Sequence, residues 1–446
     1  MSVSRVVELE GHIIDSGMMQ AAFGIVMDHG GSFDVEEFSI GRRKDEESYA
    51  RLLVSADTPE DLQQIVHDLH QHGANPADPQ DARLEPAPAD RVVPHGFYST
   101  TNHPTQIRHE GEWVPVEDIE MDCAVVVEPG AGEDTEEAAD GDGDEDGDGD
   151  GDGHGHGDGD GHGGTSPYDV RAFTKVLTAV EEGDLIVTGD AGIRVQPPER
   201  PRGQEGAFGF MQGGISAERP SKSTIEQIAG AIEETKATGG EVLVVAGPAL
   251  VHSGAREDLA RLVREGYVDA LSIGNGFAVH DVERDLYGTS LGVNTETLDH
   301  ARHGHKHHIY AISEIIRAGG IAEAVEDGLL ESGVMYECVR NEVPYVVAGS
   351  IRDDGPLPDT ITDAIEAQDA IREQAHRADL VLMLSTMLHS VAVGNCLPST
   401  TPVVCVDINP ATVTQLLDRG SAQAVGMVTD IGTFVPILAE RLLEDE

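Results

Sequence analysis

The sequence predicts an α/β protein in which a doubly wound, mostly parallel domain follows a smaller α+β domain. First, continuous apolar runs alternate with helical stretches from residue 166 onward, as buried parallel strands and crossover helices do. Second, residues 1–130 follow a βαββα order, which is typical of a ferredoxin-like unit. Third, residues 131–165 separate these regions with a low-complexity acidic segment. We therefore expect a Rossmann-like domain at 166–446 after an α+β domain at 1–130.

The first 130 residues contain alternating strand and helix patterns. The stretches SRVVELEGHII, SFDVEEFSIG and SYARLLVSA favour strands, and SGMMQAAFGIVMDHG favours a helix between the first two. A second helix is expected after Thr58 and Pro59, which are typical of a cap and a first turn. Residues 91–128 contain further short strand patterns separated by Pro and Gly.

The segment at 131–165 is rich in Asp, Gly and His and poor in apolar side chains. Its composition cannot offset the entropy of ordering, so we interpret it as a disordered linker or loop. The spacing Asp142-x-Asp144-x-Asp146 resembles the start of a calcium-binding loop, but Gly153 stands where such a loop has Glu. Three of its histidines could bind a metal only weakly (His154, His156 and His162). No metal site is predicted.

The region after 166 supplies the expected sheet and its helices. Strands are predicted at 184–190, 241–247, 268–274, 345–351, 379–385, 403–408 and 425–430. Helices are predicted from Ser223, which forms a capping box with Glu226, and at about 255–265, 309–318, 360–377, 410–419 and 431–444. Ligands of such sheets bind beyond the carboxyl ends of the strands.

The composition excludes several classes of function. The chain has 82 acidic and 29 basic residues and a net charge of −53, and only 14 of the acids lie within 133–160. Acidity spread over the whole chain disfavours nucleic acid and anionic membranes as partners and suits a high-salt cytoplasm. The four cysteines show no C-x-x-C pairing, and no signal peptide or membrane helix is evident. We expect a cytoplasmic protein.

Small and polar residues follow strand after strand, which suits a nucleotide lying across the sheet edge. They are Asn275-Gly276, Arg352 to Gly355, Thr386 to Ser390, Asp407 to Pro410, and Asp430-Ile431. Asp407 ends a strand about 20 residues past a strand-end loop, where dinucleotide folds place the carboxylate that binds the ribose diol. The alternative is that Asp407 caps the next helix, although Asn409 can do so. No G-x-G-x-x-G motif is present.

Other candidates carry charge. Residues 303–308 place Lys306 and several histidines before a helix, where an anion would offset their charge. Lys306 could act as a base, or this could be an exposed basic loop. Arg219 lies in a loop where it could hold a carboxylate or form internal ion pairs. His252 follows a strand but could be a buried structural residue. The polar stretch at 94–108 favours a closing loop or plain turns.

Long motifs in the chain resemble one known family. The stretches PHGFYSTTNHPT, AGPALVHSG, GNGFAVHD, GHKHHIYAI, SIRDDGPLPD, TMLHSVAVGN and CVDINP are similar to archaeal NAD-dependent ornithine cyclodeaminases. The same family includes the C-terminal part of cyanobacterial arginine dihydrolase/ornithine cyclodeaminases and carries the region conserved in lysine-ketoglutarate reductase/saccharopine dehydrogenase (LOR/SDH). The resemblance covers nearly the whole chain and implies a sheet nearer the deoxyhypusine synthase type. The acidic segment departs from the family and is interpreted as an insertion.

The resemblance implies an enzyme that converts L-ornithine to L-proline and ammonia. NAD would remove hydrogen from Cα, the δ-amine would close the ring, and NAD would be regenerated. The implied NAD contacts are Asn275, Gly276, Asp354, Thr386, Met387, Leu388, His389, Asp407, Asp430 and Ile431. Asn275-Gly276 would let backbone and amide approach the cofactor.

We assign hypothetical catalytic roles to three residues of this family member. Lys306 would be the base, Arg219 would bind the carboxylate, and Asp354 would lie near the nicotinamide or amine. A role in arginine and proline metabolism and a homo-oligomer are expected. Alternatives are an NAD-dependent amino-acid dehydrogenase or deoxyhypusine-synthase-like enzyme, which would release NADH or use another amine, and an NAD-bound amino-acid sensor, which would bind without turnover.

Overall fold

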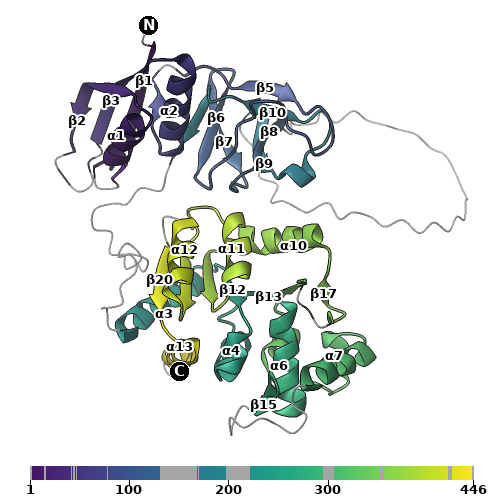
Figure 1. Ribbon diagram of the computed structural model, residues 1–446. Helices are drawn as coiled ribbons and strands as arrows, with labels where there is room; N and C mark the ends of the chain where they lie inside the picture. Colours follow the sequence, from purple (N-terminus) through teal and green to yellow (C-terminus); the bar gives the residue numbers. More distant parts are fainter. Residues whose placement is uncertain are drawn as a thin grey trace, which may run out of the picture.

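The computed structural model describes three larger sheets, one two-stranded hairpin and their helices (Figure 1). The described residues are 3–130, 168, 170–196, 221–294, 306–351, 353, 355–419 and 424–443, apart from 15–16, 42, 44–45, 47 and 78. The predicted insertion at 131–165 lies outside them. No helix in these ranges is long and apolar enough to cross a membrane.

The first sheet confirms the predicted ferredoxin-like unit. It contains β1 (Val3–Gly11), β2 (Ser32–Ser39), β3 (Ser48–Ala56) and β4 (Asn75–Pro76) in the antiparallel order β2-β3-β1-β4. The helices are α1 (Met18–Asp28) and α2 (Pro59–Gln71). Thr58 caps α2 by accepting a hydrogen bond from the Asp61 N–H, and Pro59 opens the first turn, as the sequence predicted. Leu52, Ile65 and Leu69 are fully buried between the sheet and the helices.

The second sheet is mixed and has seven strands in the order β11-β6-β7-β9-β8-β10-β5. They are β5 (Arg83–Pro86), β6 (Thr105–His109), β7 (Glu112–Glu117), β8 (Ala124–Pro129), β9 (Val170–Lys175), β10 (Leu185–Thr188) and β11 (Ile193–Val195), with a short 3-10 turn η1 (Leu177–Ala179) after β9.

The strand predicted at 184–190 belongs to this second sheet and not to the parallel one. It forms β10, which pairs antiparallel with β5 and β8. Its neighbouring residues Ile186 and Val187 are buried in two different cores. Burial on both faces gives a continuous apolar run, which the sequence alone cannot distinguish from a parallel strand.

The third sheet is parallel and has the order β17-β16-β13-β12-β18-β19-β20. Its strands are β12 (Val242–Ala246), β13 (Ala270–Gly274), β16 (Tyr345–Ala348), β17 (Thr360–Ile361), β18 (Leu380–Leu384), β19 (Val403–Asp407) and β20 (Ala424–Val428). Without the short β17, the order is 3-2-1-4-5-6, as in doubly wound dinucleotide-binding folds. The predicted fold class is confirmed.

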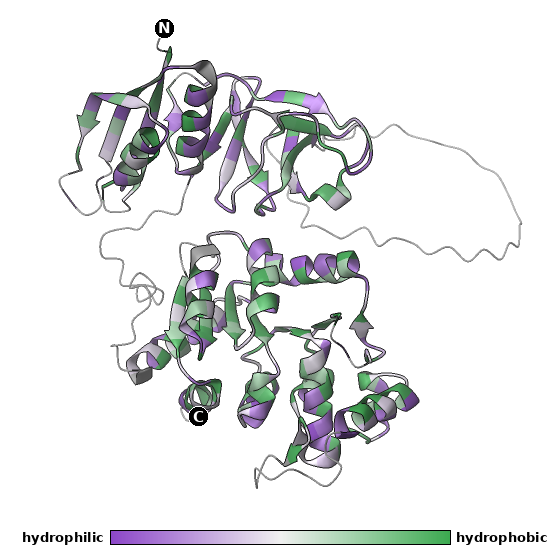
Figure 2. Ribbon diagram, in the orientation of Figure 1, coloured by the Kyte–Doolittle hydropathy of each residue, from purple (hydrophilic) through white to green (hydrophobic). Residues whose placement is uncertain are grey.

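Helices cover both faces of the parallel sheet, and the strands themselves are the most apolar segments of this domain (Figures 1 and 2). One face packs against α3 (Ser221–Ala237), α4 (Ala249–His252), α5 (Arg256–Arg264), α6 (Asn275–Tyr287) and α13 (Ile431–Leu443). The other packs against α10 (Ala364–Arg377), α11 (Met387–Cys396) and α12 (Pro410–Arg419). The remaining elements are α7 (His307–Ala318), α8 (Ile321–Glu326), α9 (Val334–Arg340) and the hairpin β14 (Thr289–Ser290) and β15 (Val293–Asn294).

The second sheet contacts the parallel domain at the amino ends of its strands. Glu120, which follows β7, accepts hydrogen bonds of 2.5 and 3.1 Å from Arg372 of α10. His103 bonds Ser399, which precedes β19, at 2.9 Å. The carboxyl ends of the parallel strands therefore lie at the opposite edge from these contacts.

Candidate active site

The strand order of the parallel sheet reverses between β12 and β18, and this switch point is where doubly wound folds bind ligands. The loops that follow these two strands are in close contact. A Cβ on Gly247 would lie 2.3 Å from the carbonyl oxygen of Ser385, so only glycine fits there. Ser385 itself has a positive φ of 49°. The two loops thus form one compact edge.

Asn275 begins α6 at the end of β13, and its side chain is buried. Its amide oxygen accepts hydrogen bonds from the Leu357 N–H at 3.0 Å and the Thr360 hydroxyl at 2.8 Å. Its amide nitrogen donates to the Gly355 carbonyl at 3.2 Å. The side chain therefore holds the loop that follows β16, whereas we expected the amide to face a cofactor.

Gly276 lies in the first turn of α6 and is open to the edge. A Cβ at this position would meet no atom within 4 Å among the described residues. The first N–H groups of a helix lack partners within the helix and attract anionic or polar ligand groups. Gly276 therefore leaves space for a ligand to approach the start of α6.

Residues 386–389 follow β18 and open α11. Within the described residues, the Thr386 side chain makes no capping bond to α11, so the first N–H groups of this helix remain for a ligand. Met387 is 41% exposed and Leu388 78% exposed. His389 differs, since its ring turns inward and bonds the buried Ser272 hydroxyl at 2.9 Å. Burial lowers the pKa of His389 to about 4, so the ring is neutral near pH 7.

Asp407 ends β19 and is half-buried at the edge. One carboxylate oxygen accepts a 2.7 Å hydrogen bond from the Asn409 N–H, and Asn409 caps α12 through the Ala411 N–H at 3.0 Å. Asn409 thus performs the capping that was the alternative role of Asp407. A carboxylate accepts several hydrogen bonds, so Asp407 can still bind a ribose diol.

The predicted contacts Asp430 and Ile431 follow β20 at the carboxyl edge of the sheet. Two exposed isoleucines lie at the same edge. Asp430 is exposed, whereas Ile431 is 4% exposed and packs in the core, so only its backbone can face a ligand. Ile351 after β16 and Ile408 after β19 are both strongly exposed. Together with Leu388 they give the edge apolar surface suited to the flat rings of a nucleotide.

The predicted catalytic residues are not brought together by the described part of the chain. Arg219 and Asp354 lie outside the described residues. Lys306 is exposed at the start of α7, where the next residue, His307, stacks on Tyr287 at the end of α6. Asn275 begins α6, and a 13-residue helix is roughly 20 Å long, so Lys306 lies at the opposite end of α6 from the Asn275 turn.

A cluster of histidines around Glu283 was not predicted as a unit. Glu283 of α6 is fully buried and accepts hydrogen bonds from His280 at 2.9 Å, from the Thr289 hydroxyl, and from the N–H groups of Leu291 and Gly292. Burial opposes ionisation of Glu283, but these bonds lower its pKa overall. The His280-x-x-Glu283 spacing on a helical pattern was the available sequence signal.

His252 joins this cluster from α4. Its ring centroid lies 4.9 Å from that of His280, and its Nδ1 is 2.6 Å from the Ser290 hydroxyl. Burial, followed by the neighbouring His280, lowers the pKa of His252 to about 4. At the end of α4 this imidazole therefore stays neutral near pH 7, where it can donate or accept a hydrogen bond but is a weak base.

The strand order and the open carboxyl edge define a Rossmann-fold protein. Family models assign residues 226–438 to the Rossmann fold of the arginine dihydrolase ArgZ-like C-terminal region, residues 104–139 and 165–225 to its first region, and residues 4–103 to the LOR/SDH bifunctional enzyme conserved region. The chain is 51% identical to the ornithine cyclodeaminase of Methanopyrus kandleri over 98% of its own length and 97% of that protein. It belongs to the family of archaeal ornithine cyclodeaminases, as its motifs suggested.

Longer cyanobacterial proteins share this region. AgrE of Nostoc, a bifunctional arginine dihydrolase/ornithine cyclodeaminase, is 42% identical over 98% of this chain and 58% of its own length. The crystal structure of apo ArgZ, a cyanobacterial arginine dihydrolase, superimposes with a TM-score of 0.79 at 37% identity over 99% of this chain and 58% of its own. The ternary complex of AgrE with ornithine and NAD⁺ superimposes with a TM-score of 0.50 at 40% identity over the same shares of the two chains.

Proposed function

We propose that this protein is an ornithine cyclodeaminase that converts L-ornithine to L-proline and ammonia, with NAD as a recycled cofactor. The main support is the 51% identity to an archaeal ornithine cyclodeaminase over nearly the full length of both chains. The AgrE relative that was crystallised with ornithine and NAD⁺ supports the choice of substrate and cofactor. The open carboxyl edge of the parallel sheet supports the location of the site.

The residues at this edge fit a dinucleotide. The starts of α6 and α11 offer backbone N–H groups to phosphate or amide groups, and Gly276 leaves room for the approach. Asp407 would bind a ribose diol, while Leu388 and Ile408 would cover an aromatic ring. The chemistry that NAD supplies when bound is reversible two-electron oxidation of the substrate at Cα.

The predicted contacts imply an unusual direction for the dinucleotide. Thr386, Asp407 and Asp430 follow the fourth, fifth and sixth strands, so the ribose carboxylate would come from the second half of the fold. Asn275 and Gly276 follow the second strand, three strand spacings or roughly 14 Å from β19. The nicotinamide and ornithine would then lie near the start of α6. This direction also explains why no G-x-G-x-x-G follows β12.

The proton transfers need groups near that position. Lys306, Asp354 and Arg219 remain the proposed base, amine contact and carboxylate contact. His252 ends α4, the helix that follows β12, and its neutral ring is a further candidate for a hydrogen bond to the substrate, although its low pKa makes it a weak base. Asn275 would act by positioning, because it fixes the loop after β16 next to the start of α6.

A turnover assay tests the proposal. Purified protein at high salt would be given L-ornithine and a catalytic amount of NAD⁺, and proline, ammonia and NADH absorbance would be followed. We expect proline and ammonia in equal amounts without net NADH. Accumulating NADH would instead indicate a dehydrogenase, and binding of NAD without any turnover would indicate a regulatory protein.

A further inference from the structure

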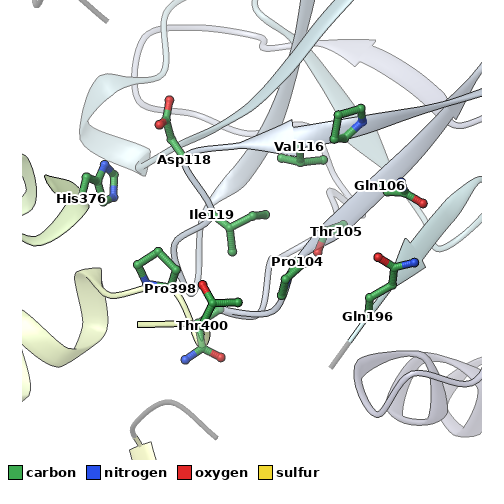
Figure 3. Close-up of a pocket in the computed structure, with 12 residues that line it drawn as sticks. Pro104, Thr105, Gln106, Val116, Asp118, Ile119, Gln196, His376, Pro398 and Thr400 are labelled. Carbon is green, nitrogen blue, oxygen red and sulfur yellow. The ribbon is translucent and has the colours of Figure 1, made fainter. Parts of the chain in front are cut away.

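A cavity of about 360 Å³ lies between the second sheet and the parallel domain (Figure 3). Pro104, Val116 and Ile119 line it from the second sheet, and His376, Pro398 and Thr400 line it from the parallel domain. His376 precedes β18, and Pro398 and Thr400 precede β19. The cavity is therefore at the amino edge of the parallel sheet, away from the proposed cofactor edge.

The cavity offers a ligand one negative charge and no cation. The twelve described residues that line it include the carboxylate of Asp118 but no Lys or Arg. Arg171 lies 3.6 Å from Asp118, but its closer partner is Glu117 at 2.6 Å. The charge of Asp118 is therefore only partly compensated. Figure 3 shows Asp118 and His376 at one side of the cavity and Gln106 and Gln196 at the other.

His376 adds no positive charge to the cavity. Its Nε2 is buried and has no hydrogen-bond partner among the described residues, while the Glu120 carboxylate is 3.9 Å away. Burial lowers the pKa of His376, so the ring is neutral near pH 7 and does not repel a cationic ligand. Glu120 is held by Arg372 and so does not add an uncompensated charge.

We propose that this cavity binds a small organic amine or guanidine that lacks a carboxylate. One cationic group would pair with Asp118, the aliphatic chain would lie against Pro104, Ile119 and Pro398, and a second cationic group would lie toward the amide oxygens of Gln106 and Gln196. A carboxylate on the ligand would be buried without a cation, which is costly. The ligand would bridge two domains and stabilise their contact. This site is independent of the proposed reaction.

Agmatine and arginine are a matched pair of probes, because they differ only by the carboxylate. Calorimetric titration of the full chain should show agmatine binding at least about tenfold more tightly than arginine, since one unpaired charge is worth at least that factor. The Asp118 side chain is 54% exposed, so water weakens its ion pair, and Asp118→Asn should weaken agmatine binding by roughly threefold to fivefold. Thr400→Phe, at an exposed residue of the rim, should block the cavity and abolish agmatine binding.

Glu112→Gln is the control, since it removes an exposed carboxylate of β7 that does not line the cavity. It should leave agmatine affinity unchanged, which separates this site from general attraction of cations to an acidic protein. None of the three variants should change ornithine turnover, because the cavity lies at the other edge of the sheet. The proposal is wrong if agmatine does not bind up to about 10 mM, if arginine binds equally well, or if agmatine affinity survives both Asp118→Asn and Thr400→Phe.

Discussion

Asp407 is the single residue on which the proposed orientation of NAD depends. Asp407→Asn keeps an oxygen for the Asn409 N–H but removes the charge that would accept from two ribose hydroxyls. We expect the dissociation constant for NAD to rise by about tenfold to a hundredfold, from the value of charged hydrogen bonds, with little change in the melting temperature. Fluorescence titration with NAD measures this.

A matched control for this variant is Asp379→Asn. Asp379 precedes β18 at the amino edge, where it accepts a hydrogen bond from the Glu241 N–H. It should leave the affinity for NAD unchanged. Equal affinities of the Asp407→Asn variant and the unmodified protein would contradict the assignment of Asp407 to the ribose.

His389, whose ring faces inward to Ser272, predicts that part of the folding stability is lost in acid. Its pKa is about 4 in the folded protein and 6.5 in the unfolded chain, so below pH 6.5 the unfolded chain binds the proton first. The contribution of neutral His389 is therefore fully present above pH 6.5 and is lost progressively as the pH falls to 4. The loss amounts to about 3 kcal/mol. Urea unfolding at a series of pH values would measure it.

His389→Gln should reduce the dependence of unfolding free energy on pH between 6.5 and 4, because no proton is then taken up at this position, while His252, whose pKa is also lowered to about 4, keeps its own contribution. His95→Gln, at an exposed residue, is the control and should keep the original slope. An unchanged slope in the His389→Gln variant would show that this histidine does not contribute the acid sensitivity.

A substitution at the start of α6 should affect the folding stability and the affinity for NAD in different directions. Gly276→Ala places a methyl group in open space inside a helix, so we expect the protein to be as stable or more stable by up to about 1 kcal/mol. The same methyl group would obstruct a cofactor at this turn and weaken NAD binding. Gly230→Ala in α3 is the matched control, because it also meets open space and should change stability alone. Unchanged NAD affinity in the Gly276→Ala variant would remove α6 from the site.

The contact of α9 with α5 and α6 depends on one glycine. Arg256 and Asp281 form an ion pair of 2.6 Å in which both side chains are 2% exposed. A Cβ on Gly333 would lie 2.1 Å from the Arg256 guanidinium, and Gly333 has a φ of 113°. Gly333→Ala should therefore destabilise the protein by roughly 3 kcal/mol or more in urea unfolding. Gly328→Ala has a positive φ but open space, and should cost only about 1 kcal/mol. Similar costs for both variants would contradict this account.

The elements were more predictable from the sequence than their contacts. Apolar runs such as VLVVA of β12 are buried on both faces. A strand buried on both faces needs apolar residues at every position, so its sequence is a continuous apolar run that can be recognised. The edge residues were found because each follows such a run. The role of Asn275 was not predictable, since its partners lie 80 to 85 residues away in the chain. The placement of Lys306 likewise depends on how α7 packs against α6.

At the scale of the whole molecule, the net charge of −53 predicts a dependence on salt. Repulsion between like charges destabilises the compact state, and added salt shortens its range. The melting temperature should rise as KCl is increased from about 0.1 M to about 2 M, where the screening length falls from about 10 Å to below 3 Å. Differential scanning calorimetry would measure the change, and a falling melting temperature would contradict the interpretation of the acidic surface as an adaptation to salt.

In the described part of the chain, the amino ends of the parallel strands contact the second sheet, whereas the carboxyl ends do not. This difference affects where a second catalytic unit can be attached to the chain. The amino ends meet the second sheet, and β1 begins beyond that sheet, at the far end of the molecule from the carboxyl edge (Figure 1). The cyanobacterial relatives match this chain over 58% of their length through a region described as C-terminal. An additional catalytic unit fused ahead of β1 would stand clear of the carboxyl edge. Gene fusion could therefore add or remove that unit without changing the proposed nucleotide site.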